Sequence, residues 1–390
     1  MRRALSLMLL IVSVLAHAQR DPRQRPRGPD DLAAVEPLPE LKSVGATGSQ
    51  GPDGNVSSTG ELVKPFCFKT LEFCATPGMR LTLWTQYGAL QALQAIESPV
   101  PFTLFGVRFA AKSKVELVPS SRHVVRGRLQ EPLDIDGRLV KGQVELQFQD
   151  RKLLHALVGT LAREAVIEGW KLPAGYSFDL QNLPSGSFVL KGPEGAAPAT
   201  WGEASPGIPT KAIGITQWRD PQGAKNLQLE LATTEKVGGL DFGPGSITFL
   251  QLDKVNAVRG VVNAGFERGA VKAPRGSSVV LCEGELQTVK TEDVAVRVGA
   301  FVTSRLNAVR ERSPGGWRND LYGQKVIDEC SEGALLGYTF LPQYCPSCDG
   351  SPKVPSLVVV DLKGEPRDAE SRAMLAAFPS SKKMTCAPCR

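Results

Sequence analysis

The sequence has little histidine and few aromatic residues, which limits the chemistry it can carry. Only three of its 390 residues are histidine, and aromatic residues make up 6%. His17 lies in the N-terminal segment, so His123 and His155 are the candidates for a site. They stand 32 positions apart with no third ligand nearby, and no nucleophile motif accompanies them. We therefore predict no metal site and no cofactor, and we interpret both histidines as structural.

The first 18 residues have the pattern of a secretory signal. A basic start, Met1-Arg2-Arg3, precedes an apolar stretch over residues 4–16, and Ala16-His17-Ala18 is a small-x-small cleavage site. Cleavage after Ala18 would release a periplasmic or secreted protein. No cysteine stands near the cleavage site, so we expect no lipid anchor there.

Neither charge sign dominates, and long apolar runs are lacking after the signal. The full chain has 46 basic and 40 acidic residues, and loss of Arg2 and Arg3 with the signal would leave 44 against 40. This balance argues against nucleic-acid binding. No later apolar run approaches the ~18 residues of a membrane span. We expect an envelope polysaccharide or another envelope protein as the partner.

Glycine corners recur along the middle of the chain, each followed by two apolar residues that flank one outward residue. Glycine supplies the positive φ that a tight corner needs. The alternation places both apolar side chains on one face of a strand. The corners and their strands are Gly78 with Leu81-Thr82-Leu83, Ser113 with Val115-Glu116-Leu117, Gly142 with Val144-Glu145-Leu146, Gly175 with Phe178-Asp179-Leu180, Gly245 with Ile247-Thr248-Phe249, Gly276 with Val279-Val280-Leu281, and a blurred copy near Ile213-Gly214-Ile215.

The spacing of these corners indicates repeated structural units. Ser113 to Gly142 is 29 positions, Gly142 to Gly175 is 33, and Gly245 to Gly276 is 31. Periods of roughly 20–50 residues are typical of stacked repeats, whose units bury their apolar faces against one another. We predict a mainly β protein built from stacked β-repeats, as a solenoid or a twisted hairpin meander. The alternative is a set of β-sandwich domains.

Composition divides the chain into four segments. After the signal (1–18), residues 19–60 are polar and rich in Arg, Pro and Gly, which predicts a disordered linker. Residues 61–300 hold the repeats, interrupted by a Gly-, Ala- and Pro-rich surface loop over 193–209. Residues 301–390 form a cysteine-rich C-terminal α+β cap, with a buried strand over 357–360 and a helix over 368–378.

Eight cysteines in an exported chain predict four disulfides. We expect Cys67–Cys74 across a hairpin and Cys282–Cys330, with the other four paired among themselves. Those four form two CxxC motifs, which could instead hold one Zn²⁺ or act as a redox pair. The eight are Cys67, Cys74, Cys282, Cys330, Cys345, Cys348, Cys386 and Cys389.

The outward positions of the repeats supply the candidate site. Glu116, Glu145 and Asp179 would stack within ~5–10 Å of one another on neighbouring strands. Paired carboxylates can hydrolyse glycosidic bonds, although nearby Lys and Arg residues would also neutralise them on a solvated face. Trp84 and Trp170 could stack on sugars.

The prediction for function is an exported, non-enzymatic binding or structural protein of a bacterial envelope or extracellular matrix. A polysaccharide-active enzyme that uses the stacked carboxylates is one alternative. A periplasmic thiol or zinc protein that uses the two CxxC motifs is the other.

Overall fold

The structure is a computed structural model. It describes residues 37–46, 55–86, 89–118, 123–202, 207–250, 252, 257–292, 295–299, 301–311, 333–341 and 357–377. The prediction of a mainly β chain is confirmed, because the structure is 61% strand and the described residues contain one α-helix, α1 (Ala369–Ala377). No helix in this part of the chain is long and apolar enough to span a membrane.

A long antiparallel sheet runs through the molecule. Each of its main strands pairs with the preceding main strand and the following one, and two short strands, β11 (Leu133–Ile135) and β22 (Glu235–Val237), extend it. In order of pairing, the main strands are β1 (Leu41–Ala46), β2 (Asn55–Leu62), β5 (Arg80–Gln86), β6 (Ala89–Glu97), β9 (Lys114–Val118), β10 (His123–Arg128), β12 (Arg138–Gln149), β13 (Lys152–Leu161), β16 (Ser177–Asp179), β17 (Phe188–Lys191), β20 (Gly214–Arg219), β21 (Lys225–Leu231), β23 (Leu240–Leu250), β24 (Ala257–Val262), β27 (Ser278–Cys282), β28 (Glu285–Lys290), β31 (Arg305–Arg310), β32 (Leu335–Phe340) and β33 (Val358–Asp361).

Shorter strands, which lie between the main strands in the sequence, form small separate sheets. They supply many of the buried aromatic side chains, so they close the core on one face of the long sheet. The small sheets are β3 (Phe66–Phe68) with β4 (Phe73–Ala75), β7 (Phe102–Leu104) with β8 (Val107–Phe109), the set β14 (Ala165–Ile167), β15 (Trp170–Leu172), β18 (Ala199–Trp201) and β19 (Lys211–Ala212), and the set β25 (Phe266–Arg268), β26 (Val271–Ala273), β29 (Val296–Val298) and β30 (Phe301–Thr303).

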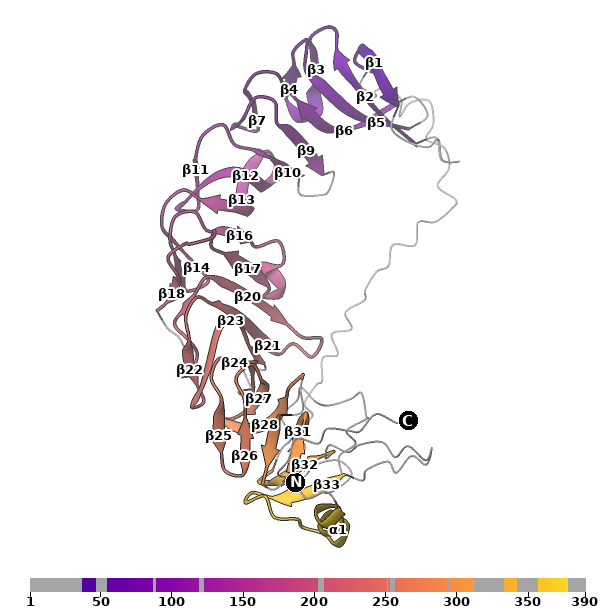
Figure 1. Cartoon of the computed structure of the whole chain (residues 1–390). Coiled ribbons are helices and arrows are strands. Elements are labelled where there is room, and N and C mark those ends of the chain that lie inside the picture. The colour runs from indigo at the N-terminus through magenta and orange to yellow at the C-terminus, as the bar shows by residue number, and fades with distance from the viewer. Residues whose placement is uncertain are drawn as a thin grey trace, which may run out of the picture.

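The elements follow one another along a curved, elongated body, from β1 at one end to β33 and α1 at the other (Figure 1). Short strands such as β14, β18, β22 and β25 lie along one side of this body, at the left in Figure 1. One hydrophobic core extends from Leu62 to Val360. We call the face of the long sheet that points away from this core the outer face.

A second series of glycines marks the turns of the short hairpins. In four of these turns both central residues have positive φ, which is the type I′ geometry that suits two-residue hairpin loops. Two of the four contain the Ile-acid-small step, Ile135-Asp136-Gly137 and Ile167-Glu168-Gly169, that closes units in the sequence. The four central pairs are Phe105-Gly106, Asp136-Gly137, Glu168-Gly169 and Gly238-Gly239.

The predicted corners Gly78, Gly175 and Gly276 stand just before β5, β16 and β27, the main strands that return from short hairpins. The prediction is wrong for Gly142 and Gly245, because each lies inside a long strand, β12 or β23, at a point where the pairing register shifts. At the first corner the Gly78 amide donates to the Leu62 carbonyl at 3.0 Å, and the Leu62 amide donates to the Met79 carbonyl at 2.8 Å. Gly78 has φ of +88°, which a residue with a Cβ adopts only with strain. The same pair of hydrogen bonds joins Leu161 to Gly175 and Tyr176, and Val262 to Gly276 and Ser277.

The prediction of Ser113 as a corner residue is wrong by one position. Lys112 takes the place of the glycine, with φ of +56°, and its amide donates to the Ser98 carbonyl at 2.7 Å. Ser113 instead matches Ser277, because the hydroxyl of each donates to a carbonyl three residues earlier at 2.7 Å.

Two predicted boundaries need correction. The linker does not extend to residue 60, because β1 and β2 lie within 41–62 and pair with each other and with β5. No break falls at residue 300, since β30 pairs with β29 and β31 with β28 across it.

The loop over 193–209 contains a strand, β18, so it is not wholly irregular. The strand near 357–360 and the helix near 368–378 are confirmed as β33 and α1.

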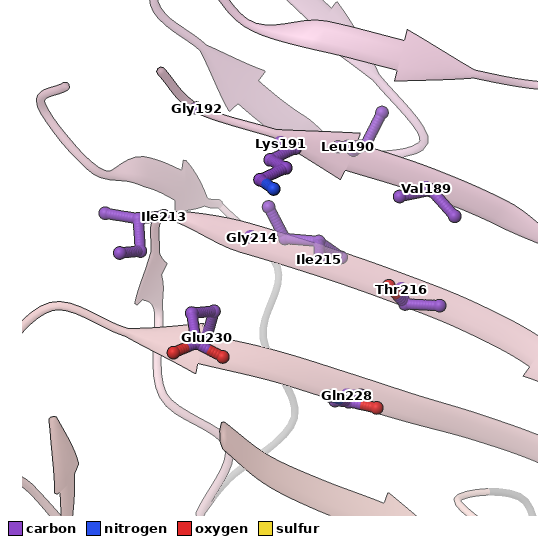
Figure 2. Close-up of a pocket in the computed structure, with 10 residues that line it drawn as sticks. All are labelled: Val189, Leu190, Lys191, Gly192, Ile213, Gly214, Ile215, Thr216, Gln228 and Glu230. Atoms are coloured by element: carbon purple, nitrogen blue, oxygen red, sulfur yellow. The ribbon is translucent and has the colours of Figure 1, made fainter. Parts of the chain in front are cut away.

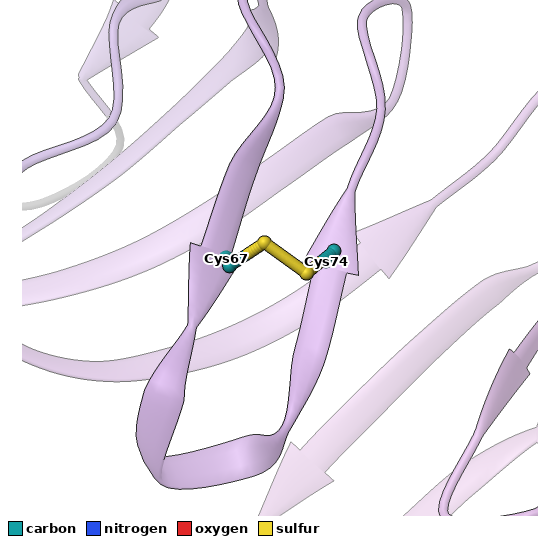
Figure 3. The surroundings of a disulfide bond; sticks show 2 residues. All are labelled: Cys67 and Cys74. Carbon is teal, nitrogen blue, oxygen red and sulfur yellow. A yellow bond between two sulfur atoms is a disulfide. The ribbon is translucent and has the colours of Figure 1, made fainter.

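The predicted Cys67–Cys74 disulfide is confirmed. Cys67 on β3 stands directly opposite Cys74 on β4, and the bond closes this short hairpin (Figure 3). Cys282 at the end of β27 is also disulfide-bonded. The remaining predicted cysteines lie outside the described residues, and with them the two CxxC motifs: Cys330, Cys345, Cys348, Cys386 and Cys389.

Candidate functional site

The outward residues predicted from the corners lie in one row across the outer face. Every step of the row is a direct pair in the strand register. We call it the central row, and its members are Thr82, Ala95, Glu116, Arg126, Glu145, Val158, Asp179, Val189, Thr216, Gln228, Thr248, Arg259 and Val280.

Each pair of predicted acids is separated by one intervening strand. Arg126 on β10 pairs with Glu116 on one side and with Glu145 on the other. Val158 on β13 stands between Glu145 and Asp179 in the same way. Two strand spacings of about 4.8 Å place successive carboxylate-bearing residues about 10 Å apart along the row.

Arg126 ties the first two acids into an ion-paired group. Its Nε donates to Oε2 of Glu145 at 2.6 Å, and the side-chain amide of Gln181 donates to the same oxygen at 3.0 Å. The Glu145 side chain is only 9% exposed. The pKa of Arg126 is raised by this hydrogen bond and by the Glu145 charge, with a smaller contribution from Glu116. Glu116 also accepts from Lys114 Nζ at 2.7 Å.

Replacing Arg126 with Met should destabilise the fold by about 1–3 kcal/mol, because the buried Glu145 carboxylate loses its charged donor. Arg128→Met is the matched control, since Arg128 lies exposed two residues further along β10. Urea unfolding of both variants measures the difference. Equal midpoints for the two variants would contradict the structural role given to Arg126. Adding Glu145→Gln to the Arg126→Met variant should restore part of the lost stability, because it removes the unpaired charge.

The other predicted site residues have different surroundings. Asp179 is partly exposed on β16, and its Oδ1 accepts a hydrogen bond from the backbone amide of Gln181 at 3.0 Å. Trp84 is partly exposed on the outer face, opposite Ser57. Trp170 is not available to a ligand: its side chain is 1% exposed and stacks on Trp201 with ring centroids 5.1 Å apart. Its predicted role as a sugar platform is therefore wrong.

His155 contacts an acid of a short hairpin. Its Nδ1 lies 3.0 Å from Oδ2 of Asp136, and the pKa of Asp136 is lowered chiefly by this hydrogen bond, with help from Arg138. The side chains of His155 and Asp136 are 58% and 46% exposed, and the structural role of His155 stays a prediction.

A hollow of about 370 Å³ interrupts the outer face over β17, β20 and β21. Lys191 and Glu230 stand directly across the strands from Gly214, one on each side (Figure 2). Because Gly214 has no side chain, the space between these two charged residues is open. Val189, Thr216 and Gln228 of the central row border the same hollow, and Leu190, Gly192, Ile213 and Ile215 complete its lining.

The acid of the hollow is already oriented. Oε2 of Glu230 accepts from the Ser246 hydroxyl at 2.6 Å, and the Gln228 side-chain amide donates to that hydroxyl at 3.1 Å. The sequence prediction did not include these residues. The sequence signal that could have indicated the hollow is the blurred copy at Ile213-Gly214-Ile215. There glycine takes the outward position that other strands fill with a side chain.

Comparison of the chain with protein-family models, with curated proteins and with solved structures finds no match.

Proposed function

We propose that the chain is an exported, non-enzymatic binding or structural protein of a bacterial envelope or extracellular matrix. The N-terminal signal pattern supports export. The Cys67–Cys74 bond is compatible with an oxidising compartment, where disulfides form and persist. In this proposal the units stack as a β-repeat array whose length serves the function.

The outer face of the long sheet supports binding to an extended partner. Its central row runs from β5 to β27 without a break in the pairing, and places polar residues of both charge signs beside short aliphatic ones. Within the row Ala95, Glu145 and Val280 are buried, and the other members are available for contacts. Such a face offers regularly spaced contacts, about one per 4.8 Å, to a polymer that lies across the strands. An envelope polysaccharide has this form.

The geometry favours binding over glycoside hydrolysis. Arg126 stands between Glu116 and Glu145, and Oε2 of Glu145 already accepts hydrogen bonds from Arg126 and Gln181. Hydrolysis canonically requires two carboxyl groups that flank one glycosidic bond, one protonated so that it can donate to the leaving oxygen and one ionised. Glu116 and Glu145 are instead held on the sheet surface as partners of neighbouring side chains.

Co-sedimentation with insoluble bacterial envelope polysaccharide tests the proposal. The full chain, purified from the periplasm, should begin at residue 19 and should be retained on the polymer without releasing reducing ends. Failure to sediment with the polymer would contradict binding, and release of reducing ends would establish the enzymatic alternative.

A matched pair of valine substitutions locates the binding face. Val261 is 52% exposed on the outer face, whereas Val166 is 65% exposed in the short-hairpin layer. We expect Val261→Glu to reduce retention several-fold and Val166→Glu to leave it unchanged. The reverse result would place the binding surface on the hairpin side.

A further inference from the structure

Gly214 differs from the other glycines that occupy ordinary strand conformations. A Cβ built at Gly60, Gly127, Gly159 or Gly260 would lie 2.5–2.8 Å from another atom, so close packing explains each of those glycines. At Gly214 the nearest atom is the Cβ of Glu230 at 3.1 Å, and the next is a carbonyl oxygen at 4.0 Å. Its φ does not lie in the left-handed range.

Backbone conformation therefore does not require glycine at position 214, and a Cβ there would meet one tight contact, with the Cβ of Glu230, which would have to shift by a few tenths of an ångström. Glycine inside a strand also weakens the strand, because it leaves no side chain to pack and has more freedom in the unfolded chain. Its structural consequence here is the hollow between Lys191 and Glu230. A strand glycine without a packing reason often marks the close approach of a ligand.

The lining of the hollow fixes the chemistry of its occupant. Lys191 is a cationic donor, Glu230 is an anionic acceptor, and Thr216 and Gln228 can both donate and accept. Val189 adds an exposed aliphatic surface, 42% exposed. The volume of about 370 Å³ lies at the small end of the range for ligand sites, roughly 300–1,000 Å³.

We propose that this hollow binds one sugar residue of a neutral polysaccharide. The inference rests on the proposed binding function and names the ligand class. Sugar hydroxyls donate and accept, so one ring satisfies Glu230, Lys191 and Gln228 together, while its C–H face lies on Val189 and the Thr216 methyl group. The carboxylates of an acidic polymer would be attracted by the Lys191 ammonium group. They would also be repelled by the Glu230 carboxylate, which lowers the affinity of the acidic polymer.

Calorimetric titration of the full chain with soluble hexasaccharides tests the assignment. The neutral probes are cellohexaose, laminarihexaose and maltohexaose, and an oligogalacturonate of the same length is the acidic probe. We expect at least one neutral probe to bind and the acidic probe to bind at least tenfold more weakly. Gly214→Val should lower the affinity for the neutral probe at least tenfold, because the side chain fills the hollow, and Glu230→Ala should lower it at least fivefold.

Thr160→Val is the matched control, because it places valine in the same row of the outer face, two strands away from Lys191 and outside the hollow. Its affinity should equal that of the parent chain. The inference is overturned by a lack of binding to every neutral probe, by stronger binding of the acidic probe, or by equal binding of the Gly214→Val variant. If that variant still co-sediments fully with envelope polysaccharide, the proposed function stands and the hollow is not its site.

Discussion

Replacing Trp170 with Ala should destabilise the protein by about 3–5 kcal/mol, the usual cost of removing a large buried aromatic side chain. Trp170 is 1% exposed on β15, and it is among the largest fully buried side chains of the core. The variant also loses the stacked contact with Trp201, which lies on the neighbouring strand β18. Urea unfolding followed by circular dichroism gives the change in free energy.

Trp84→Ala is the control, because it removes the same side chain from the outer face, where Trp84 is only partly buried. Its cost should be well below that of Trp170→Ala. Equal stability losses would mean that the two tryptophans have similar surroundings, which contradicts the layered arrangement of short hairpins over the inner face of the long sheet.

Gly159→Val should destabilise the fold by roughly 3 kcal/mol or more, near the upper end for overpacking a core. A Cβ at Gly159 would lie 2.5 Å from a methyl group of Val140 and 3.0 Å from the ring of Phe178. Both neighbours are buried and belong to adjacent strands, so neither can move without disturbing the sheet. Differential scanning calorimetry of the variant measures the loss.

Gly214→Val makes the same change on the outer face and should leave stability within about 1 kcal/mol of the parent, because valine favours strands and removing glycine lowers the entropy of the unfolded chain. A large loss at position 214, or none at position 159, would remove the distinction between a glycine required by packing and a glycine that leaves a hollow.

The glycines with positive φ and the outward row could be predicted from the sequence because both depend on local signals. Glycine at a corner is dictated by the backbone conformation of that position, as Gly78 and Gly175 show with φ of +88° and +93°. Alternation then decides which residue of each strand points outward. Thr82, Glu116 and Asp179 therefore fall in one row, although the pattern does not mark every strand between them.

The partners across the sheet could not be predicted, because strand pairing is a property of the whole chain. The pattern marks one main strand after each corner, whereas the structure places a further main strand between the strands of successive corners, such as β10 between β9 and β12. The pattern therefore gives no sign that Arg126 lies between Glu116 and Glu145. The alternation pattern also cannot tell a short hairpin in the core layer from an outer strand, which is why Trp170 was expected at the surface.

Distances between spin labels along the central row test the central claim that the repeated units form one continuous sheet with a shared outer face. Labels at Thr82 and Val158 are five strand spacings apart, those at Thr82 and Val189 seven, and those at Thr82 and Thr248 ten. Double electron–electron resonance should give about 24, 34 and 48 Å, slightly shortened by the curvature. A third distance equal to or shorter than the first would show that the chain folds back on itself, and the continuous sheet would be refuted.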